Sequence, residues 1–144
     1  MKTTLPLKLL SIDNDGAHLA LKAKINGKVA HLILDTGASR SVFDTERIDK
    51  FFKGKTKTTH VESSKLSSGL GTNTMKSKTT ELKTLQLGDL IIKTYPTVLL
   101  DLSHVNQSYS QAGLKAIDGV LGNDILMKYK ALIDYRKKEL ILSF

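Results

Sequence analysis

Most apolar residues of the chain fall in short runs at the spacing of β-strands. The first two runs, 17–25 and 29–34, flank Asn26 and Gly27. These two residue types accept the positive φ angles that a two-residue hairpin turn requires. The pattern therefore predicts a β-hairpin whose second strand ends at Leu34.

Two further strand–turn–strand patterns follow. One joins 82–87 to 90–100 through the turn Gly88-Asp89. The other joins 131–135 to 139–144 through three basic residues. Turn-forming residues between two apolar runs are typical of antiparallel hairpins. Strands are therefore expected along most of the chain.

Helical periodicity is scarce. A short helix is expected from about Asn123, with this residue as its N-cap and with Ile125 and Leu126 on its apolar face. The pattern also allows a short helix around 44–52. The segment 53–80 is rich in Lys, Ser, Thr and Gly, which predicts a mobile loop or hairpin. The sequence thus favours an all-β fold with one or two short helices.

Length and composition indicate one globular domain over residues 1–144, with 40% hydrophobic and 25% charged residues. The chain has no cysteine, which excludes disulfides, thiolate metal sites and a cysteine nucleophile. Its first residues lack the apolar run of a secretory signal, and no stretch is long enough to cross a bilayer. We therefore expect a cytoplasmic protein, or an exported one if a leader has been removed.

The net charge of +8 would favour nucleic acid or an acidic membrane if it formed one patch. The basic residues are nearly all Lys and are scattered, and the only arginines are Arg40, Arg47 and Arg136. The Lys-rich stretch 53–57 has no interleaved aromatic or Arg residue. Neither nucleic acid nor membrane is therefore expected as a partner.

The candidate chemistry lies at the end of the first hairpin, where the apolar run 31–34 leads into Asp35, Thr36, Gly37, Ala38 and Ser39. A carboxylate that activates water must be held rigidly and must leave room for substrate. Gly37 permits close approach of the backbone, Ala38 keeps the floor shallow, and the Thr36 hydroxyl can lock the loop by a hydrogen bond. The alternative interpretation is an ordinary Asp-containing turn after a strand.

A second element, 117–126, contains two apolar residues followed by Gly122 and then the expected helix. Together, Asp35-Thr36-Gly37-Ala38, Val120-Leu121-Gly122 and the strand 131–135 resemble the retropepsin-like aspartic protease family, which includes retroviral proteases and bacterial relatives. The resemblance runs from about residue 17 to residue 142.

The resemblance implies a closed all-β barrel in which the strand 120–122 lies beside the Asp35 loop. It also implies a β-hairpin flap over the substrate, whose tip we place at 67–73 because two glycines suit a mobile turn. The substrate-binding residues that the resemblance implies are Ala38 and Ser39 in the Asp35 loop, and Gly69, Leu70 and Gly71 in the flap. Two positions depart from the retroviral pattern, with Ser39 in place of the usual Asp and Asn123-Asp124 in place of Arg-Asn.

The same resemblance implies an aspartic endopeptidase in which Asp35, Thr36 and Gly37 form the catalytic triplet. Its chemistry needs two acids, and the chain has one such triplet, so a homodimer acting on a peptide or protein substrate is expected. The terminal segments 5–10 and 140–144 are the candidate interface. No metal and no cofactor are expected.

Other site chemistries fit the sequence less well. The four histidines show no metal-ligand spacing, and Asp118, Asp124 and Asp134 match no calcium loop, so helix capping and turn formation are the interpretation of Asp118 and Asp124. A different class of function is a peptide-binding or dimerisation module that keeps the fold without cleaving. The intact Asp-Thr-Gly favours catalysis, because a module without chemistry has no need of a carboxylate in a closed cavity.

Overall fold

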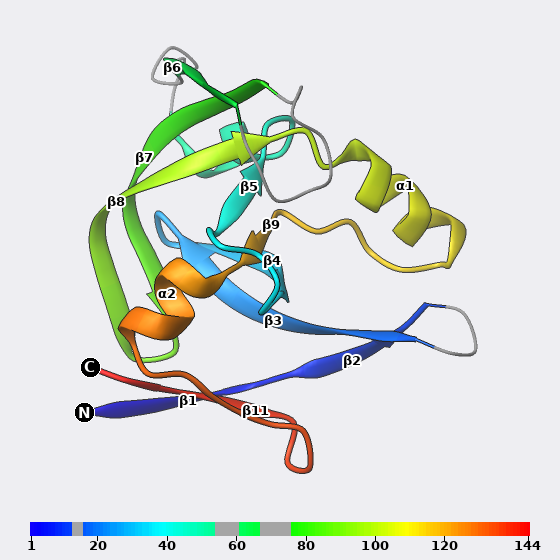
Figure 1. The fold of residues 1–144 in the computed structure, drawn as a ribbon, viewed down its shortest axis with the longest axis vertical. Helices are drawn as coiled ribbons and strands as arrows, with labels where there is room; N and C mark the ends of the chain where they lie inside the picture. The colour runs from blue at the N-terminus through cyan, green and yellow to red at the C-terminus, as the bar shows by residue number, and fades with distance from the viewer. Residues whose placement is uncertain (13–15, 54–60, 67–75) are drawn as a thin grey trace.

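The computed structural model describes residues 1–12, 16–53, 61–66 and 76–144. Figure 1 shows that strands dominate this part of the chain. The strands are β1 (Lys2–Pro6), β2 (Lys8–Ser11), β3 (Ala17–Ile25), β4 (Lys28–Leu34), β5 (Val42–Asp44), β6 (Val61–Leu66), β7 (Lys76–Leu87), β8 (Leu90–Leu100), β9 (Gly119–Leu121), β10 (Leu132–Asp134) and β11 (Glu139–Ser143). The described helices are η1 (Ile48–Phe51, 3-10), α1 (Ser103–Gln111) and α2 (Asn123–Lys128).

The β3–β4 hairpin forms as the sequence predicts. Asn26 and Gly27 adopt φ angles of 49° and 86°, the left-handed values that let two residues reverse the chain. The resulting antiparallel register places Leu21 opposite Leu32, and both side chains are buried. The turn thus fixes which face of β4 points into the core, and so fixes the direction in which the chain leaves the strand.

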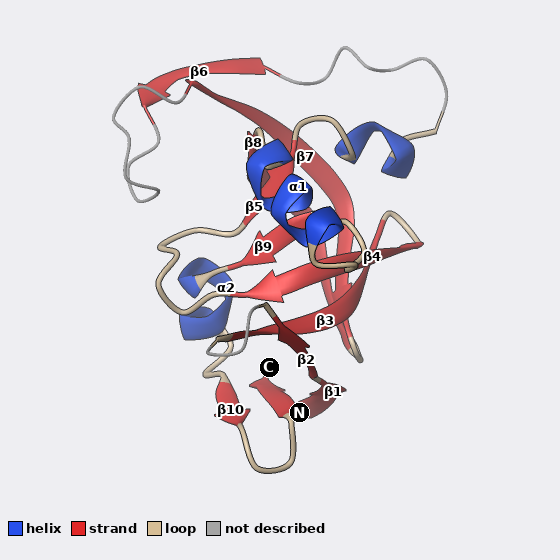
Figure 2. Ribbon diagram, turned by 90° about the vertical axis from the view of Figure 1, so that its right-hand side faces the viewer, coloured by secondary structure: helices blue, strands red, loops and turns tan. Residues whose placement is uncertain are grey.

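The main sheet closes on itself. Its strand order is β2-β3-β4-β9-β5-β8-β7-β6, and β7 also pairs with β3. The ring β3-β4-β9-β5-β8-β7 is therefore a six-stranded barrel, with β2 and β6 outside it, and Figure 2 shows β4, β9 and β5 side by side. A closed ring leaves no open edge among its own strands. The expected all-β barrel with short helices is confirmed.

The β7–β8 hairpin turns at Gly88, as predicted, but β7 begins at Lys76, well before the expected start. Gly88 has a φ of 61°, and a Cβ there would collide with the Thr3 side chain. The early part of β7 pairs antiparallel with β6 (Figure 2). The segment expected as loop or hairpin therefore contains a strand pair in its described residues.

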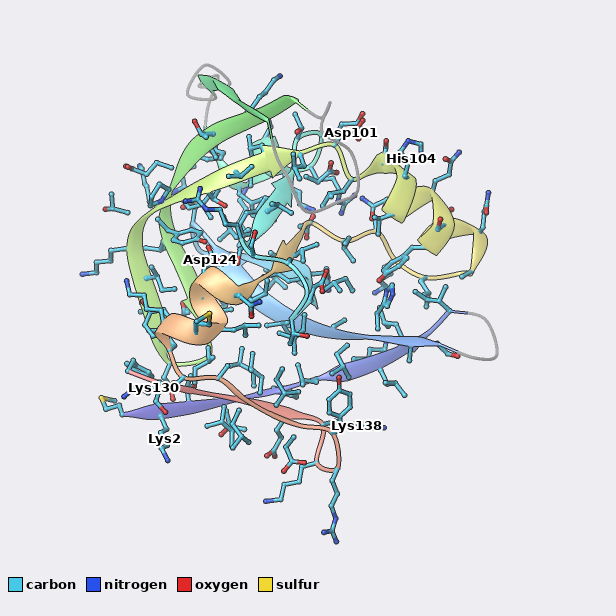
Figure 3. All side chains as sticks on the ribbon, viewed as in Figure 1. Lys2, Asp101, His104, Asp124, Lys130 and Lys138 are labelled. Atoms are coloured by element: carbon cyan, nitrogen blue, oxygen red, sulfur yellow. The ribbon has the colours of Figure 1, made fainter. Side chains whose placement is uncertain are left out.

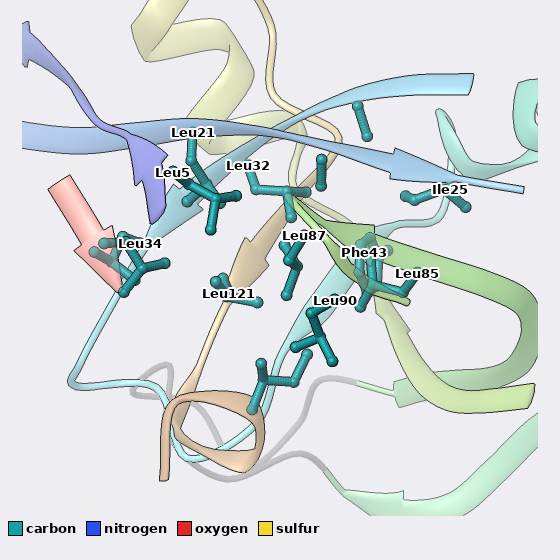
Figure 4. Close-up of a cluster of buried hydrophobic side chains, with 14 of the residues drawn as sticks. Leu5, Leu21, Ile25, Leu32, Leu34, Phe43, Leu85, Leu87, Leu90 and Leu121 are labelled. Carbon is teal, nitrogen blue, oxygen red and sulfur yellow. The ribbon is translucent and has the colours of Figure 1, made fainter. Parts of the chain in front are cut away.

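One hydrophobic cluster fills the barrel, with Leu21, Leu32, Phe43 and Leu121 among its buried side chains (Figure 4). A second cluster lies under α1 and contains Tyr109 of that helix. The sequence did not predict α1, because its nine residues carry no continuous apolar stripe. Burial of Tyr109 and two hydrogen bonds between the Asn106 side chain and the Ile117 backbone hold the helix in place.

The terminal strands form a separate three-stranded sheet, β1-β11-β10, which Figure 1 shows beneath the barrel. The expected hairpin of 131–135 with 139–144 is confirmed as β10 and β11. The terminal segment 5–10, expected at the interface, does not form one strand, because the chain divides at Leu7 between β1 and β2, which belong to different sheets. Leu7 turns its side chain into the core, and its N–H donates to Lys138 O at 2.8 Å.

Candidate active site

Asp35 follows directly on β4, and its main chain is tied to the neighbouring strand β9. The two strands pair in parallel with Leu34 opposite Leu121, and the Asp35 N–H donates to Leu121 O at 3.0 Å. The Gly37 N–H donates to Asp35 Oδ1 at 2.8 Å. A Cβ at Gly37 would lie 3.2 Å from that oxygen, so glycine gives the carboxylate room to sit against its own loop.

The second carboxylate oxygen of Asp35, Oδ2, accepts no hydrogen bond from any residue that the structure describes. The Asp35 side chain is half-buried, and Thr36 and Gly37 beside it are exposed. An oxygen without a protein donor is available to water or to a ligand. The loop therefore presents one fixed and one available carboxylate oxygen.

Two hydrogen bonds join the Asp35 loop to the start of α2. The Asn123 N–H donates to Ala38 O at 2.9 Å, and the Asn123 side-chain amide donates to Thr36 O at 2.7 Å. Asn123 was expected to be the N-cap of this helix, but that role is wrong. The N-cap residue is Gly122 and has no side-chain cap, while the Asn123 amide is used to hold the loop instead.

Glycine is required at position 122 because the backbone of the Asp35 loop passes close to the chain just before α2. A Cβ at this position would lie 2.6 Å from the Arg40 carbonyl carbon and 2.9 Å from Ala38 O, both backbone atoms that cannot move aside easily. The Gly122 N–H also donates to Ser41 Oγ at 2.9 Å. Any larger residue would push the Asp35 loop away from β9.

The predicted site residues are partly brought together. Asp35, Thr36, Gly37, Ala38 and Ser39 occupy one loop, with Ala38 half-buried and Ser39 exposed. Thr36 takes part in the described hydrogen bonds through its carbonyl, not through the hydroxyl that was expected to lock the loop. The expected flap residues Gly69, Leu70 and Gly71 lie outside the described residues.

A polar network that the sequence did not reveal connects the end of the Asp35 loop to α2 and β8. Asp124 Oδ1 accepts hydrogen bonds from the Ser41 N–H at 2.8 Å and the Ser41 hydroxyl at 2.7 Å. The Tyr95 hydroxyl donates to Asp124 Oδ2. Figure 3 labels Asp124 on α2, so the network joins α2 to the Asp35 loop and to β8. Capping was expected for Asp124, and this network replaces it.

Tyr95 is held in its donor form. Burial raises the pKa of its phenol, and the hydrogen bond to the Asp124 carboxylate raises the pKa further. Ser41 is buried and uses its hydroxyl twice, as donor to Asp124 and as acceptor from Gly122. Asp124 thus accepts three hydrogen bonds, two at Oδ1 and one at Oδ2.

Asp118 is a second carboxylate near β4, with its side chain 1% exposed. It accepts hydrogen bonds from Arg47 Nε at 2.9 Å and from the His31 N–H at 2.9 Å, and Lys50 Nζ lies 2.5 Å away. Burial on its own would raise the pKa of Asp118, but the Lys50, His31 and Arg47 hydrogen bonds outweigh it and hold the pKa below its usual value. Its expected role in a turn is wrong, because this ion-paired carboxylate anchors η1 to β4.

A hollow of about 210 Å³ opens beside the Ser41–Asp124–Tyr95 network. Its lining residues come from the Asp35 loop, β7, β8 and α2, and are Arg40, Ser41, Thr79, Tyr95, Pro96, Thr97, Val98 and Asp124. Within the described ranges, no group of three or more His, Cys, Asp or Glu is placed to hold a metal ion. No helix in the same ranges is long and apolar enough to cross a membrane.

A family model described as aspartyl protease matches residues 21–125, which include the Asp35 loop and the start of α2. No curated protein matches the sequence. Among solved structures, a retropepsin-like aspartic protease from Rickettsia conorii is 19% identical with a TM-score of 0.56, and the match covers 99% of this chain and 93% of that one.

Two further solved structures are similar. EIAV protease, complexed with an inhibitor, is 21% identical with a TM-score of 0.57, over 87% of this chain and 99% of that one. The retroviral protease-like domain of Ddi1 from Leishmania major is 16% identical with a TM-score of 0.53, over 83% and 82% of the two chains. The fold is therefore retropepsin-like, and with the family model spanning more than half of its length, the chain belongs to the aspartyl protease family.

Proposed function

We propose that the protein is an aspartic endopeptidase whose active site contains two Asp35 carboxylates, one from each subunit of a homodimer. The observation that carries the proposal is the Asp35 loop, where Oδ1 is fixed by the Gly37 N–H and Oδ2 has no described donor. Hydrolysis by this route needs a pair of carboxylates. One chain supplies one such loop, so a second copy completes the pair.

The two carboxylates would share one proton and hold a water molecule between them. The ionised carboxylate takes a proton from the water as general base while the protonated one donates a hydrogen bond to the scissile carbonyl oxygen. Water oxygen bonds to the carbonyl carbon, and the tetrahedral intermediate then breaks its C–N bond as a carboxyl group protonates the leaving amine. Thr36 and Gly37 hold the acid in place, and Ala38 and Ser39 line the start of the substrate path.

We place the subunit interface on the terminal sheet. Leu132 of β10 pairs with Ile141 of β11, and Thr4 of β1 pairs with Ile141 from the other side, so the three share the face that points away from the core. Leu132 is 54% exposed although it is apolar. An exposed apolar side chain on a sheet face, as at Leu132, suits self-association about a twofold axis.

The proposal is tested with a diverse peptide library at several pH values, with products identified by mass spectrometry. Wild type and Asp89→Asn are expected to cleave, and Asp35→Asn is expected not to. Asp89 is the matched control because it is an exposed Asp in the β7–β8 turn. A peptide-binding module would retain peptides uncut in all three proteins, and cleavage by Asp35→Asn at the wild-type rate would refute the assignment.

A further inference from the structure

The hollow beside the active-site loop contains an arginine with no described ion-pair partner. Arg40 follows Asp35 by five residues and lines the hollow with its side chain exposed. No acidic residue whose side chain the structure describes forms an ion pair with it. The guanidinium is always charged and presents a planar set of donors that matches a carboxylate.

Asp124 is the other charged residue of the hollow, but it is already engaged. Its oxygens accept from the Ser41 N–H, the Ser41 hydroxyl and the Tyr95 hydroxyl. A carboxylate surrounded by three donors has much of its hydrogen-bonding capacity used within the protein. Arg40 is therefore the charged group of the hollow that is best able to select a ligand.

The size and place of the hollow suit one side chain of a bound peptide. Its volume of about 210 Å³ is below the roughly 300–1,000 Å³ of sites that enclose a whole small molecule. Five residues of chain span at most about 17 Å, so Arg40 lies within that distance of Asp35. An extended peptide advances about 3.3 Å per residue, so a substrate residue up to about five positions from the cleaved bond can reach Arg40.

We propose that this hollow is a substrate subsite for an acidic side chain, Asp or Glu, whose carboxylate binds Arg40. The proposal rests on the proposed protease function and adds its substrate class. The net charge of +8 supports it, because a basic protein attracts acidic segments over a longer range.

The test is the cleavage of a degenerate peptide library, read as residue frequencies at each position around the cut. Wild type should favour Asp and Glu at one fixed position by about threefold to tenfold, the range for an arginine–carboxylate contact that is partly open to solvent. Arg40→Gln should lose this preference, and Arg40→Glu should favour Lys and Arg there.

Arg136→Gln is the matched control, because it removes the same charge from an exposed turn remote in sequence from the hollow, and it should keep the wild-type preference. Cleavage without an acidic preference, or a preference that survives in Arg40→Gln, overturns the subsite and leaves the protease proposal standing. Absence of cleavage by wild type instead counts against the protease.

A binding arm tests the subsite without turnover. The library is passed over immobilised Asp35→Asn protein, and retained peptides are sequenced. Enrichment in Asp and Glu that disappears in the Asp35→Asn/Arg40→Gln double variant supports the subsite, and equal retention of acidic and neutral peptides by both proteins overturns it.

Discussion

Asp35 and Asp118 both lie beside the β4–β9 strand pair, but the protein treats them differently. Asp118 is almost fully buried and receives Arg47, Lys50 and the His31 N–H. Asp35 is half-buried and receives one donor, from its own loop. A carboxylate surrounded by donors contributes stability, whereas one with an available oxygen can meet water or substrate. The number of donors thus separates a structural acid from a candidate catalytic one.

The largest effect should come from Asp35→Asn. We expect peptide hydrolysis to fall by at least about 1,000-fold, because the general base is removed. The free energy of unfolding should change by less than about 0.5 kcal/mol, since Asn keeps the shape and the acceptor for Gly37. Turnover assays and urea unfolding measure the two quantities. A large loss of stability would mean that Asp35 resembles Asp118 after all.

Asp118→Asn should show the reverse pattern. We expect the free energy of unfolding to fall by about 1–3 kcal/mol, because the side chain keeps one acceptor oxygen but loses the charge that binds Arg47 and Lys50. Peptide hydrolysis per folded molecule should be retained. Urea unfolding of this variant beside Asp89→Asn, which alters an exposed acid, isolates the buried position. Equal stability of the two variants would contradict the role of Asp118.

Acid should remove the same stabilisation gradually. Burial alone would raise the pKa of Asp118 in the folded protein. The hydrogen bonds from Lys50, His31 and Arg47 outweigh burial, so the pKa of Asp118 is lowered overall. A lowered pKa adds stability above the unfolded value of about 3.9 and loses it as pH falls toward the folded value. The difference in the free energy of unfolding between wild type and Asp118→Asn should therefore become smaller below about pH 4. A gap that stays constant to low pH would show that Asp118 does not titrate this way.

The smallest effect should come from Tyr95→Phe, which removes one donor from Asp124 and leaves the two from Ser41. We expect a loss of about 1 kcal/mol in the free energy of unfolding. The rate of hydrolysis should fall less than in Asp35→Asn, because the Ser41–Asp124–Tyr95 network supports the Asp35 loop but does not contact the bond that is cleaved. Thermal unfolding and kcat/KM together check this. Complete inactivation with unchanged stability would place Tyr95 in the chemistry itself.

The sequence predicted those features that local residues determine. Asn26-Gly27 reverses the chain with its own φ angles, and Asp35 follows a strand that its apolar residues define. It did not predict α1, whose polar surface gives no helical stripe and whose position depends on Tyr109. It also missed the bond between Ser41 and Asp124, which are 83 residues apart. Hydrogen bonds between residues so far apart in sequence form only when the barrel closes, so no local sequence pattern predicts them.

The two-sided role of the Ser41 hydroxyl has a spectroscopic consequence. Because this oxygen accepts from Gly122 and donates its own hydrogen to Asp124 inside the protein, the hydroxyl hydrogen is shielded from bulk water. Hydroxyl hydrogens of exposed serines exchange too fast to be seen by NMR, so a resolved serine hydroxyl signal marks a shielded group. Its exchange rate would report, in solution and without substrate, how often the Asp35 loop separates from the barrel.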